Sequence, residues 1–231
     1  MMKVSDKGLA EIAGHEGIVA SPYYDSVGVL TWGIGHTKAA GGIDPATLPM
    51  GKEAPLEAIL ATFREDIEDV ELRVSQAVNV PLSQTQFDAL VSFDFNTGGI
   101  YKAQLTKRLN AGDLAGAASG FDGWHKPQEI IPRRDKERKL FATGVYSNGG
   151  KALVIPADAK GKPLYRQGRT VDVLAILTAG AQTGGKPTPV SDTPFHLPPD
   201  VEPPQPQETP SGFWAVLVAI LRSIFGRRSA A

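Results

Sequence analysis

Two carboxylates near the start of the chain have the types and spacing that hydrolysis of a glycosidic bond requires. Glu16 follows a short apolar stretch, and Asp25 comes nine residues later in a polar turn. A glycosidase needs one carboxylic acid to protonate the leaving oxygen and a second carboxylate that activates water or attacks the sugar. Apolar surroundings raise the pKa of an acid, whereas a solvated turn keeps a carboxylate ionised. We therefore expect Glu16 to be the proton donor and Asp25 the second carboxylate.

Residues 23–37 are expected to fold as a tight β-hairpin that carries Asp25. Their aromatic and β-branched residues are interrupted by the turn-forming Ser26-Val27-Gly28. Thr31 then falls on the return strand, where its hydroxyl is placed to help hold a water molecule against Asp25. We expect His36 to fix the hairpin through hydrogen bonds from its ring to backbone or to an acid. An Asp in a turn is also common for local reasons, so the pair of acids alone does not establish catalysis.

The elements that must position these residues are a small hairpin lobe and a larger helical lobe. Ser5 is expected to cap a first helix that ends at Gly14. Apolar residues recur at helical spacing over residues 56–74, which predicts one long amphipathic helix between the lobes. Ser83-Gln84-Thr85-Gln86 is a capping box that opens the next helix. Further helices are expected at residues 105–109 and 113–119, and a last one begins near Pro132 and ends before Gly144.

This pattern predicts an α+β fold and four segments. Residues 1–145 form the candidate catalytic domain, with the hairpin lobe at about 15–54 and the helical lobe at about 56–145. Residues 146–182 contain short apolar runs at 152–155 and 171–177, and are expected to form a small annex whose role the sequence does not indicate. Residues 183–212 are rich in proline and predict an extended linker. Residues 213–231 are apolar with several arginines and predict a C-terminal helix.

Composition narrows the class of protein and the chemistry open to it. The chain has 231 residues, of which 42% are hydrophobic and 21% are charged, as in a soluble globular protein. Its net charge of −1 gives no reason to expect a nucleic-acid partner. It has no cysteine, and no residues at metal-ligand spacing were found, so we expect no disulfide, no metal and no cofactor. The N-terminus has no apolar stretch typical of a secretory signal peptide.

Three ordered blocks of sequence have a recognisable pattern. The first runs from Glu16-Gly17 through Tyr24-Asp25 and Gly28 to Thr31-Trp32-Gly33-Ile34-Gly35-His36-Thr37, the second covers residues 84–98, and the third contains Trp124, residues 132–137 and Leu140-Phe141. Together they closely resemble the phage lysozymes of the T4 and lambdoid type, glycoside hydrolase family 24. Trp32 and Ile34 stand where that signature more often has Ile and Tyr. The resemblance covers about residues 5–145.

The resemblance implies a lysozyme-like fold and a muramidase activity. Such an enzyme hydrolyses the β-1,4 bond between N-acetylmuramic acid and N-acetylglucosamine in peptidoglycan. Glu16 matches the family's acid, and Asp25 and Thr31 match the residues associated with the attacking water. Asn96 matches a position near the cleft that is suited to binding a sugar amide or hydroxyl. Members of this family are generally inverting, with space for water between the two carboxylates.

The expected biological role is a phage or prophage endolysin that acts as a monomer. Without a signal peptide, it would collect in the host cytoplasm and reach peptidoglycan in the periplasm through a holin-type membrane lesion. Two alternatives stay open: a non-catalytic cell-wall-binding module, and a related glycan activity such as a lytic transglycosylase or a chitinase-like hydrolase. The C-terminal segment 213–231 suits contact with an anionic membrane surface, or docking on this domain or a partner protein.

Several other residues have structural interpretations beside functional ones. Asn96 is as well suited to ending a helix, because Asn-Thr-Gly is typical of helix ends. Trp124 is more often a core residue than a sugar-stacking one. Arg133 and Glu137 are four residues apart and are expected to pair on a helix, although arginines here could also bind peptidoglycan carboxylates. His15 is expected at the surface, pointing away from Glu16.

Overall fold

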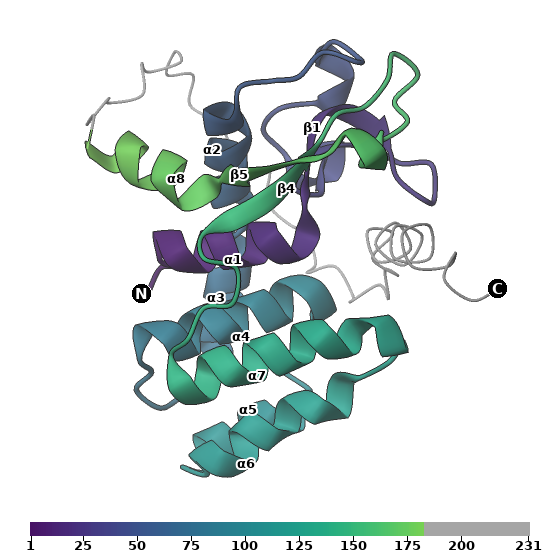
Figure 1. Cartoon of the computed structure of the whole chain (residues 1–231). Helices are drawn as coiled ribbons and strands as arrows, with labels where there is room; N and C mark the ends of the chain where they lie inside the picture. Colours follow the sequence, from purple (N-terminus) through teal and green to yellow (C-terminus); the bar gives the residue numbers. More distant parts are fainter. Residues whose placement is uncertain (183–231) are drawn as a thin grey trace, which may run out of the picture.

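A mixed sheet and a set of helices form two lobes in residues 1–182, the part of the chain that the computed structural model describes (Figure 1). The expected linker at 183–212 and C-terminal helix at 213–231 lie outside the described residues. The helices are α1 (Asp6–Glu16), α2 (Leu56–Asp66), α3 (Glu68–Ala77), α4 (Gln84–Thr97), α5 (Gln104–Asn110), α6 (Leu114–Ser119), α7 (Ile131–Thr143) and α8 (Val173–Gln182). The strands are β1 (Ile18–Tyr24), β2 (Leu30–Gly33), β3 (His36–Thr37), β4 (Lys151–Ile155) and β5 (Arg169–Asp172).

Helix α1 lies between the two lobes and ends at the predicted acid. Ser5 caps it as expected, because its side chain accepts a hydrogen bond from the backbone N–H of Gly8. The predicted end at Gly14 is wrong, since the helix continues to Glu16. Gly17 terminates it with a φ of 75°, a left-handed backbone that glycine adopts without strain. Gly14 instead permits a close approach, because a Cβ atom there would lie 2.2 Å from the Nδ2 atom of Asn148.

The sheet contains strands from both the hairpin and residues 146–182. Its order is β3-β2-β1-β4-β5, so β1 is a central strand. Figure 1 labels β1, β4 and β5. Strand β1 pairs antiparallel with β2, as the expected hairpin requires, and parallel with β4. Strand β5 then pairs antiparallel with β4, and α8 packs against α1 and α2. The segment 146–182 therefore extends the hairpin lobe across the expected boundary at residue 145.

The helix expected over residues 56–74 is interrupted at one residue. The structure has two helices in place of the one expected, and Ile67 separates α2 from α3. The first turn of α3 contains Glu68, Asp69 and Glu71. Acidic side chains stabilise a helix N-terminus through its dipole, which favours a new start at this position.

The helical lobe follows the predicted pattern closely. Ser83 and Gln86 form the expected capping box of α4, and Gly144 ends α7 in the left-handed conformation. The main core is continuous between the lobes and includes Leu9 from α1 and Leu90 from α4. Trp124 packs edge-on against Phe93, with ring centroids 5.2 Å apart, which confirms its core interpretation. Within residues 1–182, no helix is long and apolar enough to cross a membrane.

Candidate active site

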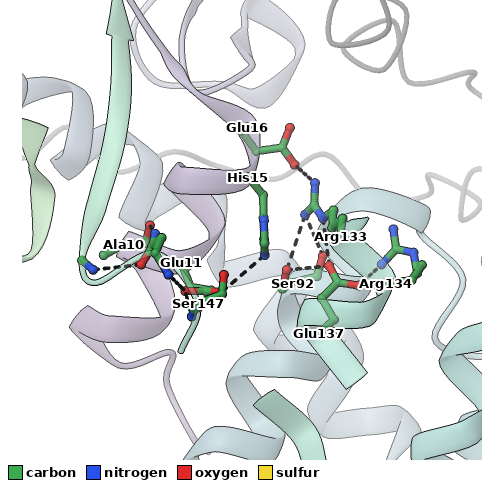
Figure 2. Close-up of polar contacts among 11 residues, drawn as sticks. Ala10, Glu11, His15, Glu16, Ser92, Arg133, Arg134, Glu137 and Ser147 are labelled. Atoms are coloured by element: carbon green, nitrogen blue, oxygen red, sulfur yellow. Dashed lines mark hydrogen bonds and ion pairs between the residues drawn. The ribbon is translucent and has the colours of Figure 1, made fainter. Parts of the chain in front are cut away.

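Glu16 is presented by the last turn of α1 and faces the helical lobe. Its side chain is only 4% exposed, so the predicted burial is confirmed. Its carboxylate accepts a hydrogen bond from the guanidinium of Arg133 on α7 (Figure 2). The apolar stripe of α1 did not predict this charged partner, because Arg133 is distant in sequence and reaches Glu16 only after the lobes pack.

Arg133 connects α1, α4 and α7 through a buried polar network (Figure 2). Its Nε atom donates to Oε1 of Glu137 at 2.8 Å, so the expected pair on one helix is confirmed. Its Nη2 atom donates to the backbone oxygen of Ser92 at 3.0 Å. The hydroxyl of Ser92 in turn donates to Oε1 of Glu137 at 2.7 Å. These contacts hold Arg133 in one orientation, which fixes the guanidinium group that meets Glu16.

Asn96 belongs to the same network through Arg134. Arg134 donates to Glu137 and to the Oδ1 atom of Asn96, and its guanidinium lies 5.2 Å from the centre of the Phe93 ring. Burial, with a smaller contribution from neighbouring Arg133, lowers the pKa of Arg134 to about 8. Helix α4 ends at Gly98, which adopts the left-handed conformation. The Nδ2 atom of Asn96 has no hydrogen-bond partner among the described residues, and a role in sugar binding stays a prediction.

Asp25 lies immediately after β1 and closes the hairpin turn. Its Oδ1 atom accepts hydrogen bonds from the backbone N–H groups of Val27 at 3.0 Å and Val29 at 2.8 Å. Its own backbone N–H donates to the oxygen of Val29 at 3.0 Å. Asp25 is half-buried, so this carboxylate meets water whereas Glu16 does not. The two carboxylates therefore stand in different environments, but Glu16 meets a cation where the sequence predicted apolar surroundings.

Thr31 lies on β2 directly opposite Tyr23 and is buried. Its hydroxyl donates to the backbone oxygen of Val29 at 3.0 Å, so Val29 contacts both Thr31 and Asp25. The hairpin thus links Thr31 and Asp25 through one residue, Val29, and a water site shared by the two stays a prediction. Because the proton of the Thr31 hydroxyl is engaged, its oxygen is left to act as a hydrogen-bond acceptor.

Glu16 and Asp25 flank the two ends of β1, and the strand is bulged between them. Its register with β2 passes from Val19 opposite Gly33 to Tyr23 opposite Thr31, which places two more residues on β1 than on β2. Such a bulge bends a strand and increases its twist. Burial raises the pKa of Tyr23, and Tyr165, Asp25 and Glu16 raise it further. Both carboxylates therefore act electrostatically on one side chain, Tyr23, which sequence reasoning did not single out.

The two histidines nearest the site, His15 and His36, are held by contacts within the fold. His36 contacts both carboxylate oxygens of Asp66, at 3.0 and 2.9 Å, and its Nε2 atom lies 2.7 Å from the backbone oxygen of Ile43. This confirms its expected role in fixing the hairpin. The expected surface position of His15 is wrong, because its side chain is only 5% exposed. The loop before β4 donates a hydrogen bond to Glu11 on the same helix, and charged residues of α7 act electrostatically on His15. The sequence pattern of α1 alone shows neither.

One group of described residues has ligand atoms close enough to surround a cation. The candidate atoms of Asp122, His125 and Asp135 lie within 4.8 Å of one another. Arg138 already forms ion pairs with both aspartates at 3.2 Å. This guanidinium occupies part of the space that a cation would need, and the group lies outside the network around Glu16.

The family model for phage lysozymes matches residues 13–137, which contain Glu16, Asp25, Thr31 and Asn96. The chain belongs to the phage lysozyme family. The endolysin of Salmonella phage P22 is 37% identical over 147 residues, which cover 61% of this chain and 99% of that protein. The SAR-endolysin of Escherichia phage Mu is 36% identical, over 54% of this chain and 73% of that protein.

Solved structures of phage lysozymes have the same fold. A crystal structure of P22 lysozyme superposes with a TM-score of 0.57 and 33% identity, over 62% of this chain and all of that one. The muramidase domain of SpmX from Asticaccaulis excentricus has a TM-score of 0.53 and 29% identity over 62% of this chain and 99% of that one. The expected lysozyme-like α+β fold is confirmed, and the protein is an endolysin with lysozyme activity. Strands β4 and β5 and helix α8 lie beyond the residues that the family model matches.

Proposed function

We propose that this lysozyme hydrolyses the β-1,4 bond between N-acetylmuramic acid and N-acetylglucosamine, with Glu16 as general acid and Asp25 as general base. The observation that supports it most is the contrast between the two carboxylates. Glu16 is buried against Arg133, whereas Asp25 stands in an open turn. A glycosidase uses one carboxyl group to give a proton and a second to take one, and the two candidates here have different surroundings.

In the proposed reaction, the proton of Glu16 passes to the glycosidic oxygen as the bond from that oxygen to the anomeric carbon breaks. A water oxygen bonds to the anomeric carbon from the opposite face and gives its proton to Asp25. Arg133 stabilises the negative charge left on Glu16, because its guanidinium is already in place. This is an inverting mechanism, for which the carboxylates stand about 6.5–9.5 Å apart. Thr31 accepts a hydrogen bond from the water, and Asn96 binds a sugar group.

The enzyme acts on peptidoglycan, as its family does. We infer that it collects in the host cytoplasm before lysis. We infer that it acts as a monomer and that release occurs through a holin-type lesion. Contact of residues 213–231 with a membrane surface stays a prediction. If a protein without residues 212–231 binds anionic liposomes as well as the full chain does, the predicted membrane contact is wrong.

The catalytic assignment is tested by neutralising each acid without changing its shape. Glu16→Gln and Asp25→Asn are expected to lower the rate of dye release from labelled peptidoglycan by about 10²–10⁴-fold, the usual contribution of a general acid or base. Both variants should still bind purified sacculi, because the lobes stay folded. Mass spectrometry of the products should find reducing ends. Products with 1,6-anhydro ends would indicate a transglycosylase, and full release by both variants would exclude these roles.

A further inference from the structure

The hydroxyl of Tyr23 is a buried polar group that nothing in the described chain satisfies. The side chain is fully buried, and its Oη atom has no hydrogen-bond partner among residues 1–182. Most buried side-chain polar atoms in proteins have a partner, so an isolated hydroxyl calls for an explanation. The place of Tyr23 on β1, which follows Glu16 and precedes Asp25 in the chain, suggests an explanation.

Tyr23 lies on the same face of the hairpin as the residues proposed to hold water. Side chains two residues apart on a strand point to the same face, which places Tyr23 with Asp25 at the end of β1. Thr31 is the cross-strand partner of Tyr23, and directly opposed residues also share a face. Glu16 acts electrostatically on the same phenol from the other end of the strand. Tyr23 therefore belongs to the same strand pair as Thr31 and precedes Asp25 by two residues.

A count of donors shows what this site lacks. The ionised carboxylate of Asp25 can only accept hydrogen bonds. The hydroxyl of Thr31 already donates its hydrogen bond to the backbone oxygen of Val29, so toward a water molecule it also acts as an acceptor. A water molecule between these two groups donates both of its protons and keeps two lone pairs. One lone pair attacks the sugar, and the other has no donor among Asp25 and Thr31.

We propose that the hydroxyl of Tyr23 supplies this missing donor and holds the attacking water together with Asp25 and Thr31. The inference rests on the proposed function, because it takes Asp25 as the base. Tyr23 keeps its own proton throughout, so the proton balance of the reaction is unchanged. The added hydrogen bond fixes the direction of the attacking lone pair, and orientation of this kind contributes strongly to rate.

In this proposal, the segment 146–182 holds the side chain of Tyr23 in position. The ring of Tyr23 packs in a small cluster with Val19, Ile155 and Ala157, and Tyr165 covers it. The backbone N–H of neighbouring Tyr24 donates to the oxygen of Gly161 at 2.9 Å. Strand β4 and the loop after it therefore hold the phenol in place, which explains why a side chain beside two polar acids is completely buried.

Tyr23→Phe tests the proposal, because it removes the hydroxyl and keeps the ring. We expect kcat on soluble glycan strands to fall by about 10- to 100-fold, with KM unchanged. The melting temperature should not fall, because the folded protein loses no hydrogen bond of its own. Tyr146→Phe is the matched control: its hydroxyl donates to Asp88 at 2.7 Å, beside Ser5 at the N-terminus of α1. That control should lower the melting temperature and leave kcat unchanged.

The outcomes separate this inference from the proposed function. A kcat for Tyr23→Phe within twofold of the wild type overturns the role of the hydroxyl. A fall in kcat accompanied by a fall in melting temperature, as large as in the control, also overturns it, because the effect is then structural. Full activity of Glu16→Gln and Asp25→Asn would refute the proposed function instead, whatever Tyr23→Phe does.

Discussion

At the scale of single residues, the partners around each charged or titratable group determine what it can do. Glu16 is buried and meets a guanidinium, Asp25 accepts two backbone N–H groups in an open turn, and Thr31 has its proton engaged. His15, beside the acid, is buried without a hydrogen bond to its Nε2 atom. The environment of each of these side chains is set by contacts within a few ångströms, so a single substitution can alter it.

His15 is expected to make the folded protein less stable in mild acid. Burial lowers its pKa well below 6.5, and positive charges on Arg133, Lys136 and Arg134 lower it further, while Glu11 lies 3.6 Å from its Nε2 atom. The unfolded chain takes up a proton on His15 as the pH falls below 6.5, whereas the folded protein does not. Its contribution to stability is therefore complete above pH 6.5 and is lost as the pH falls toward the folded-state pKa.

The measurement is urea unfolding between pH 7 and pH 5. The unfolding free energy of His15→Gln should decrease less between pH 7 and pH 5 than that of the wild type. His125→Gln is a control in a more exposed position, with a side chain that is 29% exposed. If both variants keep the wild-type pH dependence, His15 is not the group responsible.

At the scale of elements, the acid is held by helices that come from distant parts of the chain. Helix α1 presents Glu16, while α7 supplies Arg133 and Glu137 and α4 supplies Ser92. A second set of contacts fixes the middle of α1, where the Glu11 carboxylate accepts from the backbone N–H of Ser147 at 2.9 Å. The orientation of Glu16 therefore depends on how α1 packs against both the helical lobe and the loop before β4 (Figure 2).

Arg133→Leu should strongly destabilise the fold. The substitution leaves Glu16 and Glu137 as buried carboxylates without this cation, and breaking a buried ion pair costs about 3–5 kcal/mol. Arg138→Leu on the same helix is the matched control, because its partners Asp122 and Asp135 are about half exposed. Such exposed pairs contribute about 0–1 kcal/mol. Equal unfolding free energies for the two variants, measured in urea, would contradict the network described here.

At the scale of the whole molecule, one sheet joins the hairpin lobe to residues 146–182. Strand β4 pairs with β1 through Ile18 opposite Val154 and Val19 opposite Ile155. Helix α8 then packs against α1 and α2. The part of the chain beyond the family match is therefore built into the lobe that carries Asp25, and its removal would uncover one edge of β1.

Two truncations test this organisation. A protein that ends at residue 182 keeps every described element, so its melting temperature and its rate on soluble glycan should match the full chain. A protein that ends at residue 145 loses β4, β5 and α8, and exposes the apolar residues they cover. We expect its melting temperature to fall by at least about 10 °C, since each kcal/mol corresponds to a few degrees at this size. Equal melting temperatures would show that residues 1–145 form an independent domain.

Local signals predicted much of the fold and part of the site. The capping box at Ser83 and the turn at Ser26-Val27-Gly28 determine their own elements, because the residues that interact are close in sequence. The spacing of Glu16, Asp25 and Thr31 also lies within one helix end and one hairpin. The break at Ile67 and the continuation of α1 past Gly14 were missed, because neighbours from other parts of the chain influence where a helix stops.

The sequence by itself determined which acids stand on a helix end and in a hairpin turn, since hydrogen bonds within a few residues create both settings. Only the tertiary structure decided that Arg133 meets Glu16, that His15 is buried and that β4 covers Tyr23. These contacts join residues far apart in the sequence, such as Glu16 and Arg133, which are separated by 117 positions, and no periodicity or spacing encodes such a pairing. They arise only when separate elements bury their apolar faces against one another and bring distant polar groups together.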